Sequence, residues 1–559
     1  MKSLLLSLFL FLVVFPSAVQ AQKSYKITYL SSDHGKTDRD QDPIVLLVND
    51  EMVKGTSIKK LAGKADYPYQ EFYINWKTEP AEYIRTAHFS ADKSLETIDT
   101  NFLGRYEYKL TDETKKILGY TCYKAVTIVN SNNIELWYTK DLPYKASPVG
   151  MGQELGVVLE YVRNGNTAIT ASEIKKVKLD ISMPQMEVVD ALSYNDALWK
   201  SSFIQIPVFE NEQINFVDNP KTTDDGVLRF ASGTVILKKV KIPELKPGTQ
   251  GFVQAIQKSL GDAYDRTASI FLIRKSDKET FLHGMQKGMD SIETYENGNG
   301  TLYKGMVASE IFEPSIELMR FFTPFGVDHF NDRVKLKGKE WLHEVIYRQD
   351  ISEFVDALSG QEVYIGGFIG NWDKGGHDLS LELTFHPGWE TKVPKTQILP
   401  LFNTTSVMEM GGQGYPTMFD TEKGLKVNFE LKEAAKNVQL RYITTGHGGW
   451  SGGDEFNQKP NSIYLDGKQI SSFIPWRTDC GSYRLYNPVS GNFENGLSSS
   501  DLSRSNWCPA TITPPEYIDL GDLPAGKHII EVNIPQGASE GNSFSYWNVS
   551  GVLLYNSLH

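Results

Sequence analysis

Cysteine is scarce in this chain of 559 residues, which contains three: Cys122, Cys480 and Cys508. No Cys-x-x-Cys pair occurs, and this excludes a zinc ribbon and a thioredoxin-like redox motif. In an exported chain the two late cysteines, Cys480 and Cys508, are the natural disulfide partners. Cys122 is then left over, and we expect it to be buried as a small apolar residue.

Nucleotide-binding motifs and an excess of positive charge are also lacking. The sequence has neither a Gly-x-Gly-x-x-Gly nor a Gly-x-x-x-x-Gly-Lys-Ser/Thr pattern, and strands do not alternate with helices, which argues against nucleotide-binding folds. The 57 Lys and Arg residues are outnumbered by 69 Asp and Glu residues, which gives a net charge of −12. Such a chain should not bind a phosphate backbone tightly, so we expect no nucleic acid partner.

The sequence has a single long apolar run, residues 3–15, which follows the basic start Met1-Lys2. Pro16 ends this run, and Val19 and Ala21 are small residues at the two positions that signal peptidase reads. We therefore predict a signal peptide at residues 1–21 and export to the periplasm or the extracellular space. Because no second apolar run follows, we expect a mature chain without a membrane span. We also expect it to be a monomer.

Aromatic residues are abundant, at 12% of the chain. They are typical of β-rich proteins, and their flat faces also suit sugar recognition. Short runs that alternate apolar and polar residues, such as 25–29, 125–129 and 134–138, are separated by Asn, Asp, Gly and Pro. This pattern predicts double-sheet β sandwiches. Two short helices are predicted, at residues 251–260 and 351–358.

The length of the chain predicts about three domains. We expect a β-rich accessory domain at residues 22–190 and a polar linker at 191–224. Two further β-rich domains are expected at 225–388 and 389–559.

The accessory domain resembles the exported GLPGLI family. The resemblance lies in the order of three stretches, at residues 118–125, 135–139 and 156–160. It implies no chemistry, so this domain is predicted to have an accessory role.

The two later domains resemble the peptide-N-glycosidase F family over residues 225–559, more than half of the chain. In the first half, residues 317–327 match the family's Arg-Phe-Ile-Thr-Pro-Tyr strand and turn, and 371–380 close the domain. In the second half, residues 440–450 correspond to an inner strand and its turn, and an Arg-x-x-Trp-Cys-Pro signature occupies 504–509. The shared order and spacing of these matches carry the resemblance.

The family fold is a pair of antiparallel eight-stranded jelly rolls packed side by side, with the active site in the cleft between them. The resemblance therefore predicts a mostly β protein with tandem jelly-roll sandwiches behind an N-terminal β-rich domain. It also implies hydrolysis of the amide between asparagine and the first N-acetylglucosamine of N-linked glycans. Cleft carboxylates, helped by arginine and tryptophan, can catalyse this without a metal ion or a cofactor. An N-linked glycoprotein or glycan is the expected partner.

The resemblance also implies site residues. Glu455 stands where the family carries a cleft glutamate and is expected to be catalytic. Arg504 matches an arginine near the cleft, and Trp372 matches a tryptophan that borders the substrate. His447 and Trp450 lie beside Glu455 in the sequence and are expected to contact the substrate.

Two departures from the family pattern concern the catalytic acids. The family's second cleft glutamate, two residues before Trp372, is replaced by Gly370. The principal catalytic aspartate lies in a Cys-x-x-Trp-Asp-Arg segment, which is missing after the strand at residues 271–273. Asp277 and Asp290 stand in that region and are the candidates to replace it.

Three functions remain open at this point. An amidase with a shifted acid predicts that a carboxylate from the region of Asp277 and Asp290 points into the cleft near Glu455. A catalytically inactive relative that binds glycans or proteins predicts that Glu455 stands alone. A copper monooxygenase shares the jelly-roll pair but needs clustered imidazoles, usually with His-x-His. The ten histidines are scattered without a His-x-His pair, so this function ranks last.

Overall fold

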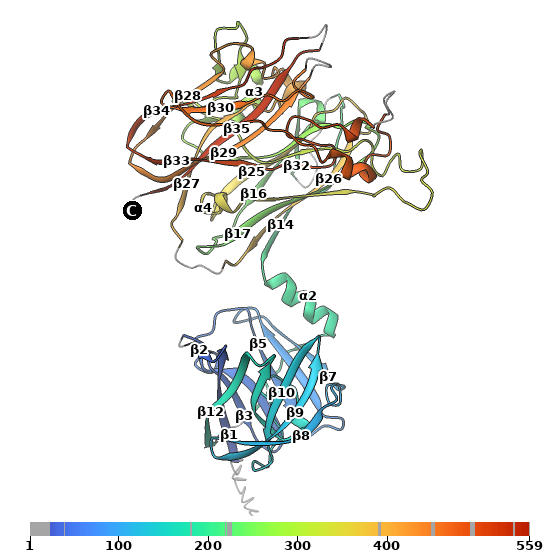
Figure 1. Ribbon diagram of the computed structural model, residues 1–559, viewed down its shortest axis with the longest axis vertical. Helices are drawn as coiled ribbons and strands as arrows, with labels where there is room; N and C mark the ends of the chain where they lie inside the picture. The colour runs from blue at the N-terminus through green and yellow to red at the C-terminus, as the bar shows by residue number, and fades with distance from the viewer. Residues whose placement is uncertain are drawn as a thin grey trace, which may run out of the picture. The chain divides into compact units, whose positions relative to one another are not determined.

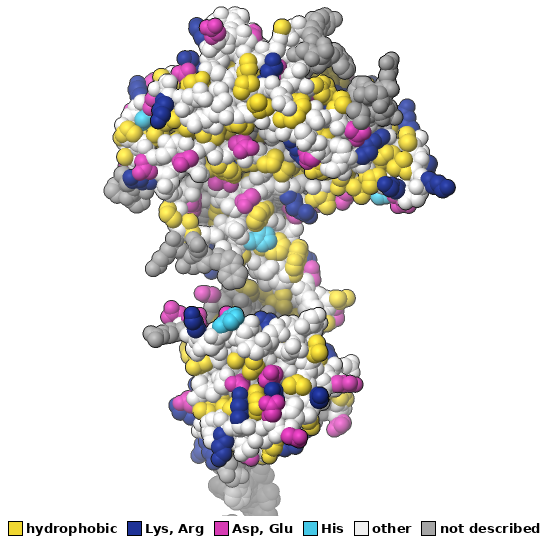
Figure 2. Space-filling view, viewed as in Figure 1, with side chains coloured by type: hydrophobic (Ala, Val, Ile, Leu, Met, Phe, Trp, Pro, Cys, Tyr) yellow, Lys and Arg dark blue, Asp and Glu magenta, His cyan; other side chains and the backbone are white. Residues whose placement is uncertain are grey.

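The computed structural model describes residues 23–38, 40–178, 181–218, 220, 226–388, 393–448, 453–491, 498–539 and 543–557. The predicted signal peptide therefore lies outside the described residues. The chain divides into two compact units, residues 1–202 and 203–559. Acidic and basic side chains are interspersed on the visible face of each unit (Figure 2). Within the described part of the chain, no helix is both long enough and apolar enough to cross a membrane.

The first unit is built on one large sheet, whose strands pair antiparallel except for β13 with β7. Ile27 and Tyr29 of β1 are buried in its core, and so is Cys122, as predicted. The unit also contains helix α1 (Ile58–Leu61), the 3-10 helix η1 (Gln153–Leu155) and helix α2 (Ala191–Ser201), whose Tyr194 packs on β6 and β7. The strand order is β13 (Glu187–Val188), β7 (Ser94–Asp99), β6 (Glu82–His88), β5 (Tyr69–Asn75), β4 (Met52–Ser57), β3 (Ile44–Val48), β1 (Lys23–Asp33), β12 (Thr167–Lys178), β11 (Val157–Arg163), β10 (Asn132–Thr139), β9 (Tyr120–Val129) and β8 (Lys109–Ile117), with β2 (Lys36–Thr37) paired to β1.

Two sheets form the first jelly-roll sandwich of the second unit. One has the order β14 (Ile204–Ile214), β26 (His377–His386), β17 (Gln250–Ser259) and β24 (Val345–Asp350). The other has the order β15 (Leu228–Phe230), β16 (Val235–Lys241), β25 (Glu362–Ile369), β18 (Thr267–Ile273), β23 (Ile316–Phe322) and β32 (Ile512–Thr513). Shorter elements connect the strands: η2 (Ala231–Gly233), β19 (Glu279–Thr280), α3 (Phe281–Lys287), η3 (Met289–Ser291), β20 (Thr294–Tyr295), β21 (Tyr303–Lys304), β22 (Phe312–Glu313), η4 (Ser352–Phe354) and α4 (Val355–Leu358).

Two four-stranded sheets form the second sandwich, and all of their strands except β31 are labelled in the upper part of Figure 1. The first has the order β27 (Thr396–Asn403), β35 (Tyr546–Ser557), β29 (Ala435–His447) and β33 (Glu516–Leu523). The second has the order β28 (Leu425–Leu431), β34 (Gly526–Asn533), β30 (Asn461–Leu465) and β31 (Lys468–Phe473). The 3-10 helices are η5 (Glu409–Gly411), η6 (Met418–Asp420), η7 (Cys480–Tyr486) and η8 (Ser499–Asp501). The tandem jelly-roll fold predicted from the sequence is thus confirmed.

Three local predictions have different outcomes. The short helix at residues 351–358 is confirmed as η4 and α4, whose apolar residues enter the core of the first sandwich. The helix at 251–260 is wrong: this stretch is strand β17, and its residues alternate between buried and less buried positions, which is the period of a strand. The stretch 191–224, predicted to be a linker, contains α2 and β14. β14 pairs with β26, so the first sandwich begins before residue 225.

A buried ion pair lies at the seam between the two sandwiches. The side chains of Glu317 and Arg320, both on β23, are 0% exposed, and Nη2 of Arg320 lies 2.7 Å from the Glu317 carboxylate. Arg320 also donates to three groups of the second sandwich: the hydroxyls of Thr405 and Thr445 at 2.9 and 3.1 Å, and the backbone carbonyl of Asn548 at 2.6 Å. One guanidinium therefore joins both sandwiches where their strands meet.

Glu317→Gln leaves the Arg320 charge buried without its counter-ion. We expect the free energy of unfolding to fall by about 3–5 kcal/mol in urea titrations, the usual cost of removing one partner of a buried pair. Asp332→Asn is the matched control, since Asp332 pairs with Lys335 where the two side chains are 94% and 74% exposed. Loss of such a surface pair costs less than about 1 kcal/mol. Equal stability of the two variants would contradict the role of this pair.

Candidate functional site

A cavity of about 270 Å³ opens where strand ends of the two sandwiches meet. The first sandwich contributes the residues just before β18 and just after β25. The second contributes the segment after β27, the end of β29 and the start of β35. The residues that line it include Asp265, Arg266, Gly370, Trp372, Glu409, Tyr415, His447, Glu455, Trp507, Tyr546 and Asn548.

Two carboxylates on the wall of this cavity share one buried arginine. Arg504, with a side chain 1% exposed, donates from Nη1 to Oε1 of Glu455, and its Nη2 lies 3.3 Å from Oδ2 of Asp265. Burial raises the pKa of Glu455 to about 7, against the opposing effect of Arg504. Burial likewise raises the pKa of Asp265 to about 6. Two carboxyl groups that exchange protons near neutral pH are thus held side by side, which suits general acid and base catalysis.

Asp265 was missed by the sequence analysis. It stands in the triplet Tyr264-Asp265-Arg266, which keeps the aromatic-Asp-Arg order of the segment that seemed to be missing, but lies before β18 rather than after it. The structure does not bring the two predicted replacements to the cavity. Asp277 is exposed, and Asp290 has a side chain 95% exposed and pairs with Lys304 at 2.6 Å. An aromatic-Asp-Arg triplet directly before an apolar strand was the signal that could have identified Asp265.

Trp372 lies at the rim of the cavity, as the resemblance implied, with 52% of its surface exposed. The guanidinium of Arg266 lies over its ring, 5.3 Å from the centroid. Arg266 is itself held by Asp262, which accepts from Nε at 2.7 Å and from Nη2 at 3.1 Å. Burial opposes ionisation of Asp262, but hydrogen bonds from His377 and Arg266 outweigh it and lower the pKa to about 2. Trp372 therefore presents a fixed, partly exposed apolar face of the kind that sugar rings contact.

Glu409 fills the space that a side chain at Gly370 would occupy. A Cβ atom added to Gly370 would lie 2.8 Å from Oε1 of Glu409. Tyr415 donates to Oε2 of Glu409 at 2.6 Å, while Oε1 is buried with no hydrogen-bond partner among the described residues. Burial raises the pKa of Glu409. The carboxylate lost at position 370 is thus replaced from the other sandwich, by a residue that the sequence analysis did not single out.

His447 ends strand β29 at the floor of the cavity and is 4% exposed. Its ring packs against those of Phe322, Trp507 and Tyr546, with centroids 5.7, 5.5 and 5.1 Å away. Its Nε2 lies 2.8 Å from Oγ1 of Thr445. The predicted contact residue Trp450 lies outside the described residues.

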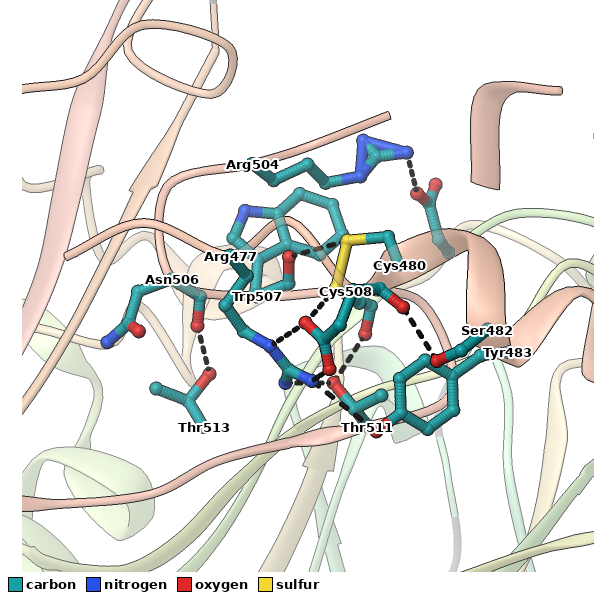
Figure 3. Close-up of a disulfide and its surroundings, with 12 residues drawn as sticks. Arg477, Cys480, Ser482, Tyr483, Arg504, Asn506, Trp507, Cys508, Thr511 and Thr513 are labelled. Atoms are coloured by element: carbon teal, nitrogen blue, oxygen red, sulfur yellow. Dashed lines mark hydrogen bonds and ion pairs between the residues drawn. A yellow bond between two sulfur atoms is a disulfide. The ribbon is translucent and has the colours of Figure 1, made fainter. Parts of the chain in front are cut away.

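The predicted disulfide between Cys480 and Cys508 is confirmed, and it anchors the segment that carries Arg504 (Figure 3). The backbones of Arg477 and Arg504 exchange hydrogen bonds of 2.9 and 3.1 Å. Trp507 precedes Cys508, and the guanidinium of Arg504 lies over its ring, with Cζ 4.5 Å from the ring centroid. The disulfide therefore fixes the segment that holds the shared arginine in the cavity.

Across the described ranges, no group of three or more His, Cys, Asp or Glu side chains is placed to hold a metal ion. The cavity lining includes the carboxyls of Asp265, Glu409 and Glu455 and the imidazole of His447, and the guanidinium of Arg504 contacts two of these carboxyls.

Comparison with known proteins gives consistent matches along the chain. The profile described as N-glycanase peptide, N-terminal domain, matches residues 27–196. The profiles of peptide-N-glycosidase F, N terminal and C terminal, match residues 205–385 and 414–554. No curated protein matches the sequence. The resemblance of the N-terminal unit to the GLPGLI family stays a prediction.

Solved structures match nearly the whole chain. A structure of PNGF-II is 54% identical and superimposes with a TM-score of 0.88 over 95% of this chain and 99% of that one. A second crystal form of PNGF-II is 53% identical, with a TM-score of 0.85 over 96% and 99%. A recombinant peptide:N-glycanase F is 16% identical, with a TM-score of 0.43 over 64% of this chain and 96% of its own. The profiles and the identity to PNGF-II show that this chain belongs to the peptide-N-glycosidase F family.

Proposed function

We propose that the chain is an exported peptide-N-glycosidase that hydrolyses the amide between asparagine and the first N-acetylglucosamine of N-linked glycans. The observation that carries this proposal is the pairing of Asp265 and Glu455 through Arg504 in one cavity. Membership of the family supports the reaction class. The substrate class is therefore an N-linked glycoprotein or glycopeptide.

The two pKa values suggest separate roles for the two carboxyls. Asp265, with the lower pKa of about 6, is the base that takes a proton from water while the water oxygen attacks the amide carbonyl carbon. Glu455, with a pKa of about 7, is the acid that gives its proton to the nitrogen as the carbon–nitrogen bond breaks. One water is consumed, and the products are an aspartate side chain and a glycosylamine. Arg504 holds both carboxyls in place throughout.

The rest of the cavity suits the sugar. The exposed face of Trp372 offers an apolar surface for the C–H groups of a pyranose ring. The buried Oε1 of Glu409 offers a hydrogen-bond acceptor for a sugar hydroxyl or amide. The alternative of a catalytically inactive binding protein required Glu455 to stand alone, whereas Asp265 lies beside the same arginine. The amidase is therefore the function we favour.

Glycan release from a denatured N-glycoprotein tests the proposal, with mass spectrometry reading the conversion of asparagine to aspartate. The wild-type chain should release the glycan. Asp265→Asn and Glu455→Gln should each lower the rate by about a hundredfold or more, because a positioned acid or base contributes that much. Asp277→Asn and Asp290→Asn are matched controls and should keep the wild-type rate. No release at high enzyme concentration would leave the binding function as the better description.

The pH dependence of kcat/KM should be bell-shaped on a short glycopeptide. The value falls below about pH 6, because Asp265 gains a proton and can no longer act as a base. It also falls above about pH 7, because Glu455 loses the proton that it must donate. Glu455→Gln should remove the alkaline limb from the residual activity. A wild-type profile that is flat across both values would contradict these roles.

Removal of the disulfide tests how the shared arginine is held. The double substitution Cys480→Ser with Cys508→Ser should lower the free energy of unfolding by about 2–4 kcal/mol. It should also slow glycan release, because Arg504 is no longer anchored. Cys122→Ala removes the buried free thiol and serves as the control. Reductant should reproduce the loss in the wild type and have no further effect on the double variant; equal sensitivity in both would argue against this role.

A further inference from the structure

Amide hydrolysis builds negative charge on the carbonyl oxygen, so the site needs a hydrogen-bond donor besides its acid and base. Several N–H and O–H groups that line the cavity are already used. Arg266 donates to Asp262, Tyr415 donates to Glu409, and the ring N–H of Trp507 donates to a backbone carbonyl at 3.1 Å. Each of these would have to give up a bond within the protein to serve the substrate.

His447 is held in one tautomer by its neighbours. Nη1 of Arg320 lies 3.1 Å from Oγ1 of Thr445, and since a guanidinium only donates, the Thr445 oxygen is the acceptor. The hydroxyl hydrogen of Thr445 then has one acceptor among the described residues, Nε2 of His447 at 2.8 Å. Leaving this buried hydroxyl without an acceptor would cost about 1–3 kcal/mol. Nε2 is therefore unprotonated, and the neutral ring carries its hydrogen on Nδ1.

The ring also stays neutral. Burial lowers the pKa of His447 far below its usual value, and the positive charges of Arg320 and Arg504 act in the same direction. Among the described residues, none forms a hydrogen bond with Nδ1 of His447, although the side chain lines the cavity. The Nδ1–H group of this cavity-lining ring thus has no hydrogen-bond partner among the residues that the structure describes.

We propose that His447 donates its Nδ1–H hydrogen bond to the carbonyl oxygen of the asparagine side-chain amide during hydrolysis, an inference that rests on the proposed function. Its ring packs against Trp507, on which the guanidinium of Arg504 also lies, so donor and carboxyls share one wall. His447 neither gains nor loses a proton. The proton of the attacking water goes to Asp265, and the leaving nitrogen receives the proton of Glu455.

Three substitutions at one position separate a donor from a packing residue. His447→Asn places an amide N–H near the position of Nδ1, His447→Gln reaches the position of Nε2, and His447→Leu removes both. We expect His447→Leu to lower kcat by about a hundredfold, the usual effect of removing one oxyanion donor, with little change in KM. His447→Asn should recover at least about tenfold over His447→Gln. The pH profile should keep its shape, because His447 does not titrate.

The hydroxyl of Tyr546 is the rival donor, since it also lines the cavity. A larger loss of kcat in Tyr546→Phe than in His447→Leu would assign the donor to Tyr546 and overturn the proposal. Equal activity of the Asn and Gln variants would also overturn it, because packing alone does not distinguish the two nitrogen positions.

The tautomer of His447 can be measured without an activity assay. Nitrogen-15 NMR of histidine-labelled wild type should show His447 protonated at Nδ1 and bare at Nε2. This pattern should stay unchanged from about pH 5 to about pH 9, because burial lowers the pKa of the ring. Thr445→Val should shift the ring toward the other tautomer. If the wild-type protein releases the glycan but NMR shows the hydrogen on Nε2, the role of His447 is overturned and the proposed function stands. Absence of release with the Nδ1–H tautomer in place would overturn the proposed function, and the role of His447 with it.

Discussion

Buried positive charge at the seam between the two sandwiches is the constraint on which the site depends. Arg320 has no exposed surface, so its guanidinium must find partners within the protein. It finds them in both sandwiches, in the carboxylate of Glu317 and in the hydroxyls of Thr405 and Thr445. Hydrogen bonds are directional, so the two sandwiches lock in one relative position. The cavity walls, which come from both, are fixed by the same contacts.

The same buried charge of Arg320 influences the protonation and tautomer of His447. It helps to keep the imidazole of His447 neutral, and its bond to Thr445 sets which ring nitrogen carries the hydrogen. A second buried guanidinium, Arg504, lies between two acids whose pKa values are raised by burial to about 6 and about 7. The positive charge of Arg504 between the two acids offsets part of the cost of holding carboxylates away from water.

The sequence predicted the architecture better than the site. Strand alternation and turn residues predicted double-sheet sandwiches, the family resemblance predicted their tandem arrangement, and the disulfide followed from the count of cysteines. Strand β17 was mistaken for a helix because a short apolar run fits both periods, and only pairing with β24 and β26 decides between them. In the site, Glu455 and Trp372 lie at the cavity as the resemblance implied. Asp265 was missed because it precedes strand β18, whereas the family pattern places its aspartate after that strand. Glu409 was missed because it fills the space beside Gly370 from the other sandwich, which only the folded structure shows.

Strand β32 makes the first sandwich depend on the second for one edge of its sheet. This two-residue strand belongs in sequence to the second sandwich, yet it pairs with β23 at the end of a sheet in the first. A chain cut between the sandwiches would leave β23, which is buried along its whole length, with a bare row of backbone donors and acceptors. Such an edge recruits strands from other molecules. The first half is therefore not a separable module, and expressing it without the second should lower its solubility.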